Sequence, residues 1–104
     1  MEINILNNKY DVLNIKTKEI KEEDIKNYFT EYFLDFDYVI GDYYGDRLRL
    51  KGFYDKDNKK VKKYNNFENK DSYLKENIEE GANYFILRKQ KSNWKNKRQV
   101  LILY

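Results

Sequence analysis

The part of the sequence that most constrains the fold is residues 37–54, DYVIGDYYGDRLRLKGFY, because it predicts a β-hairpin. Gly45 lies near its centre and supplies the positive φ that a tight turn needs. In the second half, cations alternate with leucines and a glycine. The cations are Arg47, Arg49 and Lys51, and the residues between and after them are Leu48, Leu50 and Gly52. Since residues two apart in a strand project to the same face, this pattern predicts one cationic and one apolar face.

The expected turn is either Tyr44-Gly45 or the four residues 43–46. A turn centred there pairs Asp42 with Arg47, Ile40 with Arg49 and Tyr38 with Lys51. The opposite face, which we expect to pack on the core, holds Val39, Gly41, Tyr43, Leu48, Leu50 and Gly52. The cationic row is therefore expected to face outward, as a surface available to a ligand or partner.

Two further elements are predicted before this hairpin. The runs 3–6 and 10–15 alternate apolar and polar residues on either side of Asn7-Asn8, which predicts an N-terminal hairpin. A helix is predicted from Glu22 to about Leu34, since acidic residues open it and an apolar stripe follows the helical spacing. The stripe is Ile25, Tyr28, Phe29, Tyr32 and Phe33.

The remaining elements follow the hairpin. Residues 55–63 predict a polar turn that can continue as a lysine-protected edge strand. A second helix is expected from Asn69 or Asp71 to Glu80, with Gly81 at its C′ position. Two strands are expected beyond it, 83–88 and 100–104, joined as a basic C-terminal hairpin from about residue 83.

The order ββ-α-ββ-α-ββ predicts an α+β fold with a mostly antiparallel sheet of hairpins and two helices. The chain has 104 residues, which suits a single domain over 1–104, and a monomer is expected. There is no Cys and no His, so disulfides, thiolate metal sites and His-dependent catalysis are excluded. No long apolar run and no signal-peptide pattern is found, so we expect a cytoplasmic protein without membrane contact.

Charge is distributed unevenly along the chain. Residues 1–46 carry five Lys and eleven acids, a net −6, whereas residues 47–104 carry sixteen Lys and Arg and seven acids, a net +9. Such asymmetry favours a polyanionic partner. The alternative is that the seventeen Lys and thirteen Asn reflect an AT-rich genome, in which lysine fills the surface. The arginines of the hairpin are therefore more informative than the lysines.

The motifs of the hairpin resemble those of a known family. Residues 38–42 (YVIGD), Gly45 and residues 47–54 (RLRLKGFY) are similar to the signature of the YutD-like bacterial proteins, and 81–88 (GANYFILR) with Tyr73-Leu74 resembles the family's second half. The likeness runs from about Ile3 to Arg88. It implies a small cytosolic α+β domain of low-GC Gram-positive bacteria or their wall-less relatives. It implies no activity, because the family has no assigned biochemical function.

The chain departs from the family pattern at two places. The Cys or other small residue expected near Gly81 is absent, and the Trp expected in the hairpin turn is Tyr43 here. A function that rested on that thiol could not be shared by this chain.

Two binding functions are compatible with the hairpin. The first is nucleic-acid binding, with RNA preferred, in which cations contact phosphates and aromatic rings stack on bases. The second is a protein adaptor, since Tyr, Trp and Arg are the usual hot-spot residues of interfaces and an exposed sheet edge can accept a strand. The candidate residues for either are Tyr38, Tyr43, Tyr44, Arg47, Arg49, Lys51, Arg88, Lys91, Trp94, Lys95 and Lys97.

A third hypothesis, metal-dependent phosphodiester cleavage, is disfavoured. Asp35, Asp37, Asp42 and Asp46 could suggest a cation cluster. The common nuclease motif, however, needs an acid two positions before its lysine, and Arg49 stands there before Lys51. We therefore expect no enzyme activity, no metal and no cofactor.

Overall fold

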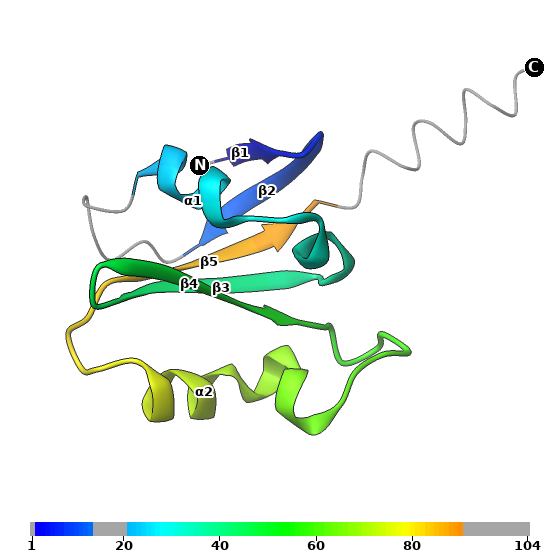
Figure 1. Cartoon of the computed structure of the whole chain (residues 1–104). Coiled ribbons are helices and arrows are strands. Elements are labelled where there is room, and N and C mark those ends of the chain that lie inside the picture. Colours follow the sequence, from blue (N-terminus) through cyan, green and yellow to red (C-terminus); the bar gives the residue numbers. More distant parts are fainter. Residues whose placement is uncertain (1, 14–20, 91–104) are drawn as a thin grey trace, which may run out of the picture.

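The computed structural model describes residues 2–13 and 21–90 of the chain. Its strands are β1 (Glu2–Ile5), β2 (Asn8–Leu13), β3 (Tyr38–Tyr44), β4 (Arg47–Phe53) and β5 (Tyr84–Lys89). They form one sheet in the order β1-β2-β5-β3-β4, and each neighbouring pair is antiparallel (Figure 1). The predicted α+β class with an antiparallel sheet is confirmed.

Helices cover both faces of this sheet (Figure 1). One face carries α1 (Glu22–Tyr28) and the 3-10 helix η1 (Glu31–Asp35). The other face carries α2 (Lys70–Asn77), which two short 3-10 helices precede, η2 (Lys63–Asn65) and η3 (Phe67–Asn69). No helix in the described ranges is long and apolar enough to cross a lipid bilayer.

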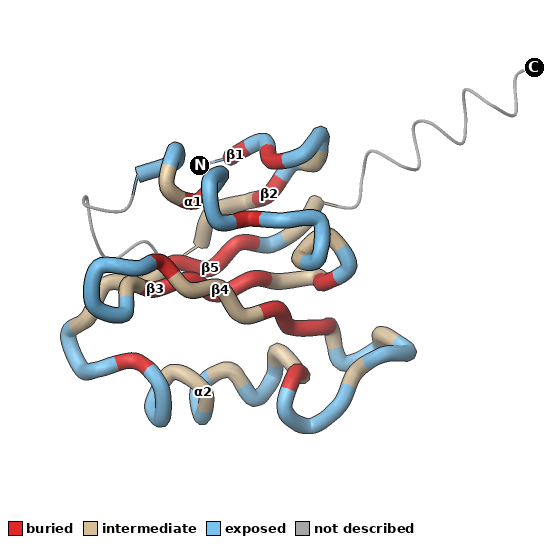
Figure 2. The backbone as a smooth tube through the Cα atoms, in the orientation of Figure 1, coloured by how far each residue is buried: buried red, intermediate tan, exposed pale blue. Residues whose placement is uncertain are grey.

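Each face of the sheet has its own apolar cluster. Ile25 and Phe29 pack on the α1 side against Val39 and Phe85, whereas Ile78 packs on the α2 side. The α2-side cluster also contains Ile40, Phe53 and Ile86. Figure 2 shows the buried segments concentrated in the central strands of the sheet. Because β5 is buried from both sides, its sequence is a continuous apolar run rather than an alternating one.

The predicted first helix is interrupted. Phe29 and Thr30 have extended backbone conformations, so α1 ends at Tyr28 and the chain resumes as η1. The apolar stripe is divided accordingly: Ile25 and Phe29 are buried, whereas Tyr28 and Tyr32 are exposed. The helical spacing therefore predicts the burial of Ile25 and Phe29 correctly, and its prediction that Tyr28 and Tyr32 belong to the same buried stripe is wrong.

Other boundaries differ by a few residues. The first hairpin turns at Leu6-Asn7, both with positive φ, rather than at Asn7-Asn8. Residues 55–63 form turns without the edge strand that was expected. The helix α2 ends at Asn77, before the expected Glu80.

The strand β5 lies between β2 and β3, which occupy both of its edges along residues 86–88. The expected hairpin partner, residues 100–104, lies outside the described residues. The extent of the domain over 1–104 stays a prediction.

Candidate binding surface

The β3–β4 hairpin turns one position later than expected. Gly45 and Asp46 form the turn, with Gly45 at a φ of 64°, and Tyr44 pairs with Arg47. The pairs that follow are Asp42 with Arg49, Ile40 with Lys51 and Tyr38 with Phe53. The expected pairing of Asp42 with Arg47 is therefore wrong. Each residue nevertheless stays on its predicted face of the sheet. Moving the turn by one position changes every cross-strand partner by two positions, and residues two apart share a face.

Arg49 is anchored inside the domain. Its Nε donates to Asp42 Oδ1 at 2.8 Å and its Nη2 to Asp42 Oδ2 at 3.1 Å, and Nη2 also donates to the carbonyl oxygen of Asn77. Only 2% of Asp42 is exposed. The hydrogen bond from the Asp42 carboxylate raises the pKa of the Arg49 guanidinium. Arg49 thus joins β4 to β3 and to the end of α2, and the prediction that it faces outward as a free cation is wrong.

The other two cations of the row differ from Arg49. Arg47 is exposed beside the turn. The ammonium nitrogen of Lys51 lies 5.6 Å from the centroid of the Phe53 ring and 5.4 Å from that of Tyr64, and the residue is half-buried. The row predicted to be uniform is therefore graded, from an exposed Arg47 through an ion-paired Arg49 to a ring-flanked Lys51.

The three tyrosines of β3 have different roles. Tyr38 stacks on Phe67, with ring centroids 3.6 Å apart, so one face of its ring is covered. The hydroxyl of Tyr43 donates to Asp24 at 2.7 Å, and this bond, with burial, raises the pKa of Tyr43 to about 12. Tyr44 is 71% exposed, and the Arg49 guanidinium carbon lies 4.7 Å from its ring centroid. Of the three rings, that of Tyr44 is the most exposed to a partner.

The remaining predicted site residues lie away from the hairpin or outside the described chain. Arg88, on β5, donates to Asp11 at 3.0 Å. That contact, followed by a hydrogen bond from Gln90, lowers the pKa of the Asp11 carboxyl. Outside the described residues are Lys91, Trp94, Lys95 and Lys97. The structure therefore does not place Arg88 with the hairpin cations.

The aspartates considered as a metal site are dispersed. Asp35 accepts from Lys60 at 2.7 Å, and Asp37 accepts from the backbone N–H of Asp55 at 2.8 Å. Asp42 is paired with Arg49, and Asp46 stands in the turn. Within 2–13 and 21–90 no three acidic side chains gather as a metal site would require.

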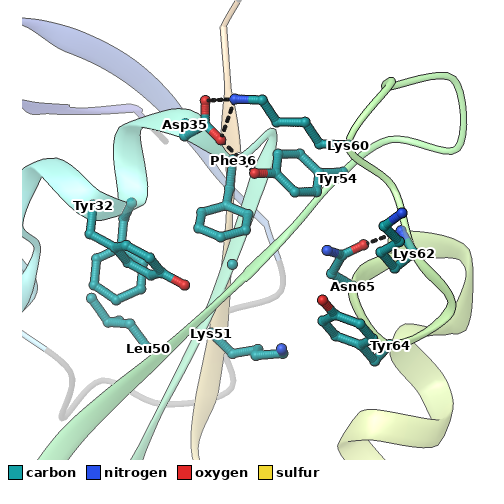
Figure 3. Close-up of a pocket in the computed structure, with 12 residues that line it drawn as sticks. Tyr32, Asp35, Phe36, Leu50, Lys51, Tyr54, Lys60, Lys62, Tyr64 and Asn65 are labelled. Carbon is teal, nitrogen blue, oxygen red and sulfur yellow. Dashed lines mark hydrogen bonds and ion pairs between the residues drawn. The ribbon is translucent and has the colours of Figure 1, made fainter.

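A hollow of about 440 Å³ lies between η1, β4 and the segment before α2 (Figure 3). Its aromatic lining comes from Tyr32, Phe33, Phe36, Tyr54 and Tyr64. The ring of Phe36 lies directly on Gly52, where a side chain would collide with it. Figure 3 shows Tyr32 and Tyr64 on opposite sides of the hollow, with Lys51 between them.

The rim of this hollow is fixed by polar contacts. The Tyr54 hydroxyl donates to Asp35 at 2.5 Å, and the Lys60 ammonium donates to both carboxylate oxygens. The bonds from Lys60 and then Tyr54 lower the pKa of Asp35, whereas burial and the Asp35 bond raise the pKa of Tyr54 to about 12. These contacts connect η1 to the loop after β4.

A second hollow, of about 780 Å³, lies on the α2 side of the same strand. Lys51 and Tyr64 line both hollows, and Lys63, Tyr73 and Glu76 line this one alone. Sequence reasoning missed both, because it assigned Tyr32 to a buried helical stripe and gave Tyr64 no role. The signal that could have located them is the cluster of tyrosines around the one strand that carries three cations.

The comparisons with known proteins agree with this fold. The profile of a family described as "Putative antitoxin YutD-like" matches residues 4–88. A Bacillus subtilis (strain 168) protein named "Putative antitoxin YutD" is 30% identical over 85 residues, which are 82% of this chain and 93% of that protein. The solution NMR structure of B. subtilis YutD superposes with a TM-score of 0.71 at 28% identity, covering 88% of this chain and 83% of that one. The resemblance seen in the sequence motifs is thereby confirmed.

Proposed function

Because the chain belongs to the YutD-like family, we propose that it is a non-catalytic binding module that contacts a partner protein along the outer side of β4. The relative from B. subtilis carries the name "Putative antitoxin YutD". An antitoxin has a toxin as its counterpart, so a protein is the first class of partner to test.

The observation that carries the proposal is the position of the exposed aromatic side chains. The large hydrophobic side chains exposed in the described residues are Leu6, Tyr28, Tyr32, Tyr44 and Tyr64. Three of these, Tyr32, Tyr44 and Tyr64, border β4, and Arg47 is exposed opposite Tyr44. Tyrosine and arginine are enriched at protein interfaces and among their hot spots. We call this group of Tyr32, Tyr44, Arg47 and Tyr64 the β4 patch.

RNA is the second candidate, supported by the cations near the β4 patch, Arg47, Lys51 and Lys62. Two of the predicted contacts are weakened, however, since Arg49 is paired with Asp42 and the Tyr38 ring is half covered by Phe67. Binding of RNA through phosphates must weaken with salt, with a log–log slope of roughly −0.7 per phosphate neutralised on a single strand. Binding that resists both salt and nuclease would exclude RNA as the partner.

The experiment is affinity capture from bacterial lysate with the immobilised chain, with and without nuclease, followed by titration of the captured protein in purified form. We expect nuclease-resistant binding whose Kd rises at least about tenfold in the Tyr44→Ala/Arg47→Ala variant, because loss of a hot spot typically costs 2 kcal/mol or more. The matched control is Leu6→Ala, an exposed apolar residue in the turn at the other edge of the sheet, which should not change the Kd. Equal affinity of both variants would contradict the proposal.

A further inference from the structure

The strand β4 has an open outer edge. It is the last strand in the sheet order, and Gly45-Asp46 limits it at one end. At the other end Asn66 bridges Tyr54 in parallel. Between these limits no described residue hydrogen-bonds to the outer side of the strand. The open stretch is therefore residues 47–52.

The direction of the backbone groups along this stretch follows from Tyr54. Its N–H donates to the carbonyl of Asn65 at 2.7 Å and its carbonyl accepts from Phe67 N at 2.9 Å, so both Tyr54 groups point away from β3. Backbone groups alternate in direction along a strand, and the β3–β4 register runs without a bulge. The groups that point outward are therefore those of Gly52, Leu50 and Leu48.

From these observations we propose that the open edge of β4 binds an extended segment of the partner protein as a sixth strand, and that this segment alternates acidic and apolar side chains. The inference rests on the proposed function and specifies its mode of recognition. Addition of a strand to a sheet edge obtains affinity from backbone hydrogen bonds and specificity from pockets for alternate side chains.

The two hollows match the two faces of such a segment. Side chains of an added strand would project alternately to the α1 face and the α2 face. On the α1 face they would meet the hollow lined by Tyr32, Phe33, Phe36 and Leu50, which suits an apolar side chain. On the α2 face they would meet the row that contains Arg47 and Lys51.

The charges along β4 indicate whether the added strand comes from a second copy of this chain or from a different protein. Antiparallel pairing of two β4 strands would bring the cationic rows of both copies together on one face, and like charges opposite one another destabilise a sheet. The Arg49 charge is balanced by Asp42, but those of Arg47 and Lys51 are not balanced by an ion pair among the described residues. Acidic side chains in the incoming segment would balance them, while Glu76 in the α2-side hollow limits how many acids fit there.

The test uses the ¹⁵N-labelled full chain and a synthetic peptide that alternates Glu with Val and Leu. We expect amide exchange at Leu48, Leu50 and Gly52 to slow at least tenfold on binding, whereas the amides of Arg49 and Lys51, which face β3, change little. A peptide of the same composition with its acids and apolar residues in two blocks, and one with Lys in place of Glu, should bind at least tenfold more weakly.

A matched pair of variants separates backbone pairing from side-chain contact. Leu50→Pro removes an outward N–H, which edge strands tolerate, whereas Leu50→Ala shortens the side chain and keeps the N–H. The Pro variant should lose both peptide binding and the protection of the outward amides. The Ala variant loses apolar contact in the hollow lined by Leu50, so it should bind the peptide more weakly while the amides of Leu48, Leu50 and Gly52 are still protected in the complex. If the Pro variant unfolds, the test of strand addition rests on the amide exchange of the wild-type chain with and without the peptide.

Three outcomes would overturn the proposal. They are no binding of the alternating peptide at millimolar concentration, binding without protection of the three outward amides, and displacement of the peptide by a single-stranded oligoribonucleotide that perturbs those amides itself. A captured protein partner that still binds Leu50→Pro but not Tyr44→Ala/Arg47→Ala would leave the proposed function standing and remove only the strand addition.

Discussion

Replacing Arg49 by methionine should destabilise the domain by about 2–4 kcal/mol. The substitution leaves the Asp42 carboxylate, whose side chain is 3% exposed, without its bidentate partner. Removal of one member of a buried pair typically costs 3–5 kcal/mol. The Arg49 side chain is 35% exposed, however, so water can partly replace it and the expected cost is about 1 kcal/mol smaller than that range.

The assay is urea unfolding followed by far-UV circular dichroism, with linear extrapolation to water. Arg47→Met is the matched control, because Arg47 lies on the same strand and the same face but is exposed, and it should change the free energy of unfolding by no more than about 0.5 kcal/mol. A double-mutant cycle with Asp42→Asn should give a coupling energy of about 1–3 kcal/mol. If Arg49→Met and Arg47→Met were equally stable, the reasoning about the buried pair would be refuted.

Three further predictions concern the core and the buried hydroxyls. Gly41→Ala should destabilise the domain by about 1–3 kcal/mol in the same urea assay, because the new Cβ would lie only 2.2 Å from Cζ of the fully buried Phe85. Unchanged stability would mean that this ring can move aside. Phe29→Ala should cost about 3–5 kcal/mol, since only 4% of Phe29 is exposed, and a loss below 1 kcal/mol would contradict its place in the core. The pKa values of Tyr43 and Tyr54 are raised from 10.0 to about 12, so the stability that these hydroxyls contribute should be complete below pH 10 and lost as the pH rises towards 12. Burial also raises the pKa of Tyr10 to about 12, so near-ultraviolet tyrosinate absorbance should show several late-titrating groups, one of which disappears in Tyr54→Phe.

The fold was largely predictable because its signals are local and mutually consistent. Alternation over 3–6 and 10–13 and over 38–53 identifies the two hairpins, and the continuous apolar run at 84–87 identifies the central strand. What the sequence could not provide is the strand order. The pairing of β5 with β2 and β3 joins segments more than forty residues apart, and no turn connects them.

The break in the first helix illustrates a limit of periodicity. Phe29, Phe33 and Phe36 are spaced four and three residues apart, which fits a continuous helix and equally fits a short helix followed by a 3-10 turn. Both place these rings toward the sheet. They differ in where they place Tyr32, which packs edge-on against Phe33 and Phe36 and is 68% exposed. The residue that the two conformations place differently is thus one of those that line the hollow on the α1 side.

The candidate site is more sensitive than the fold to small errors of register. A turn at Tyr44-Gly45 and one at Gly45-Asp46 both use the same glycine, so the sequence does not choose between them. Yet moving a two-residue turn by one position changes the partner of Asp42 and exchanges the set of amides that faces outward. Only contacts distant in sequence settle the choice: Asn77 accepts from Arg49, and Asn65 accepts from Tyr54. The amides that the strand addition proposed for β4 would use therefore depend on the loop and helix that follow the hairpin. A change there that shifted the register would turn the amides of Leu48, Leu50 and Gly52 toward β3 and those of Arg49 and Lys51 outward, so the protection pattern expected with the alternating peptide would be exchanged.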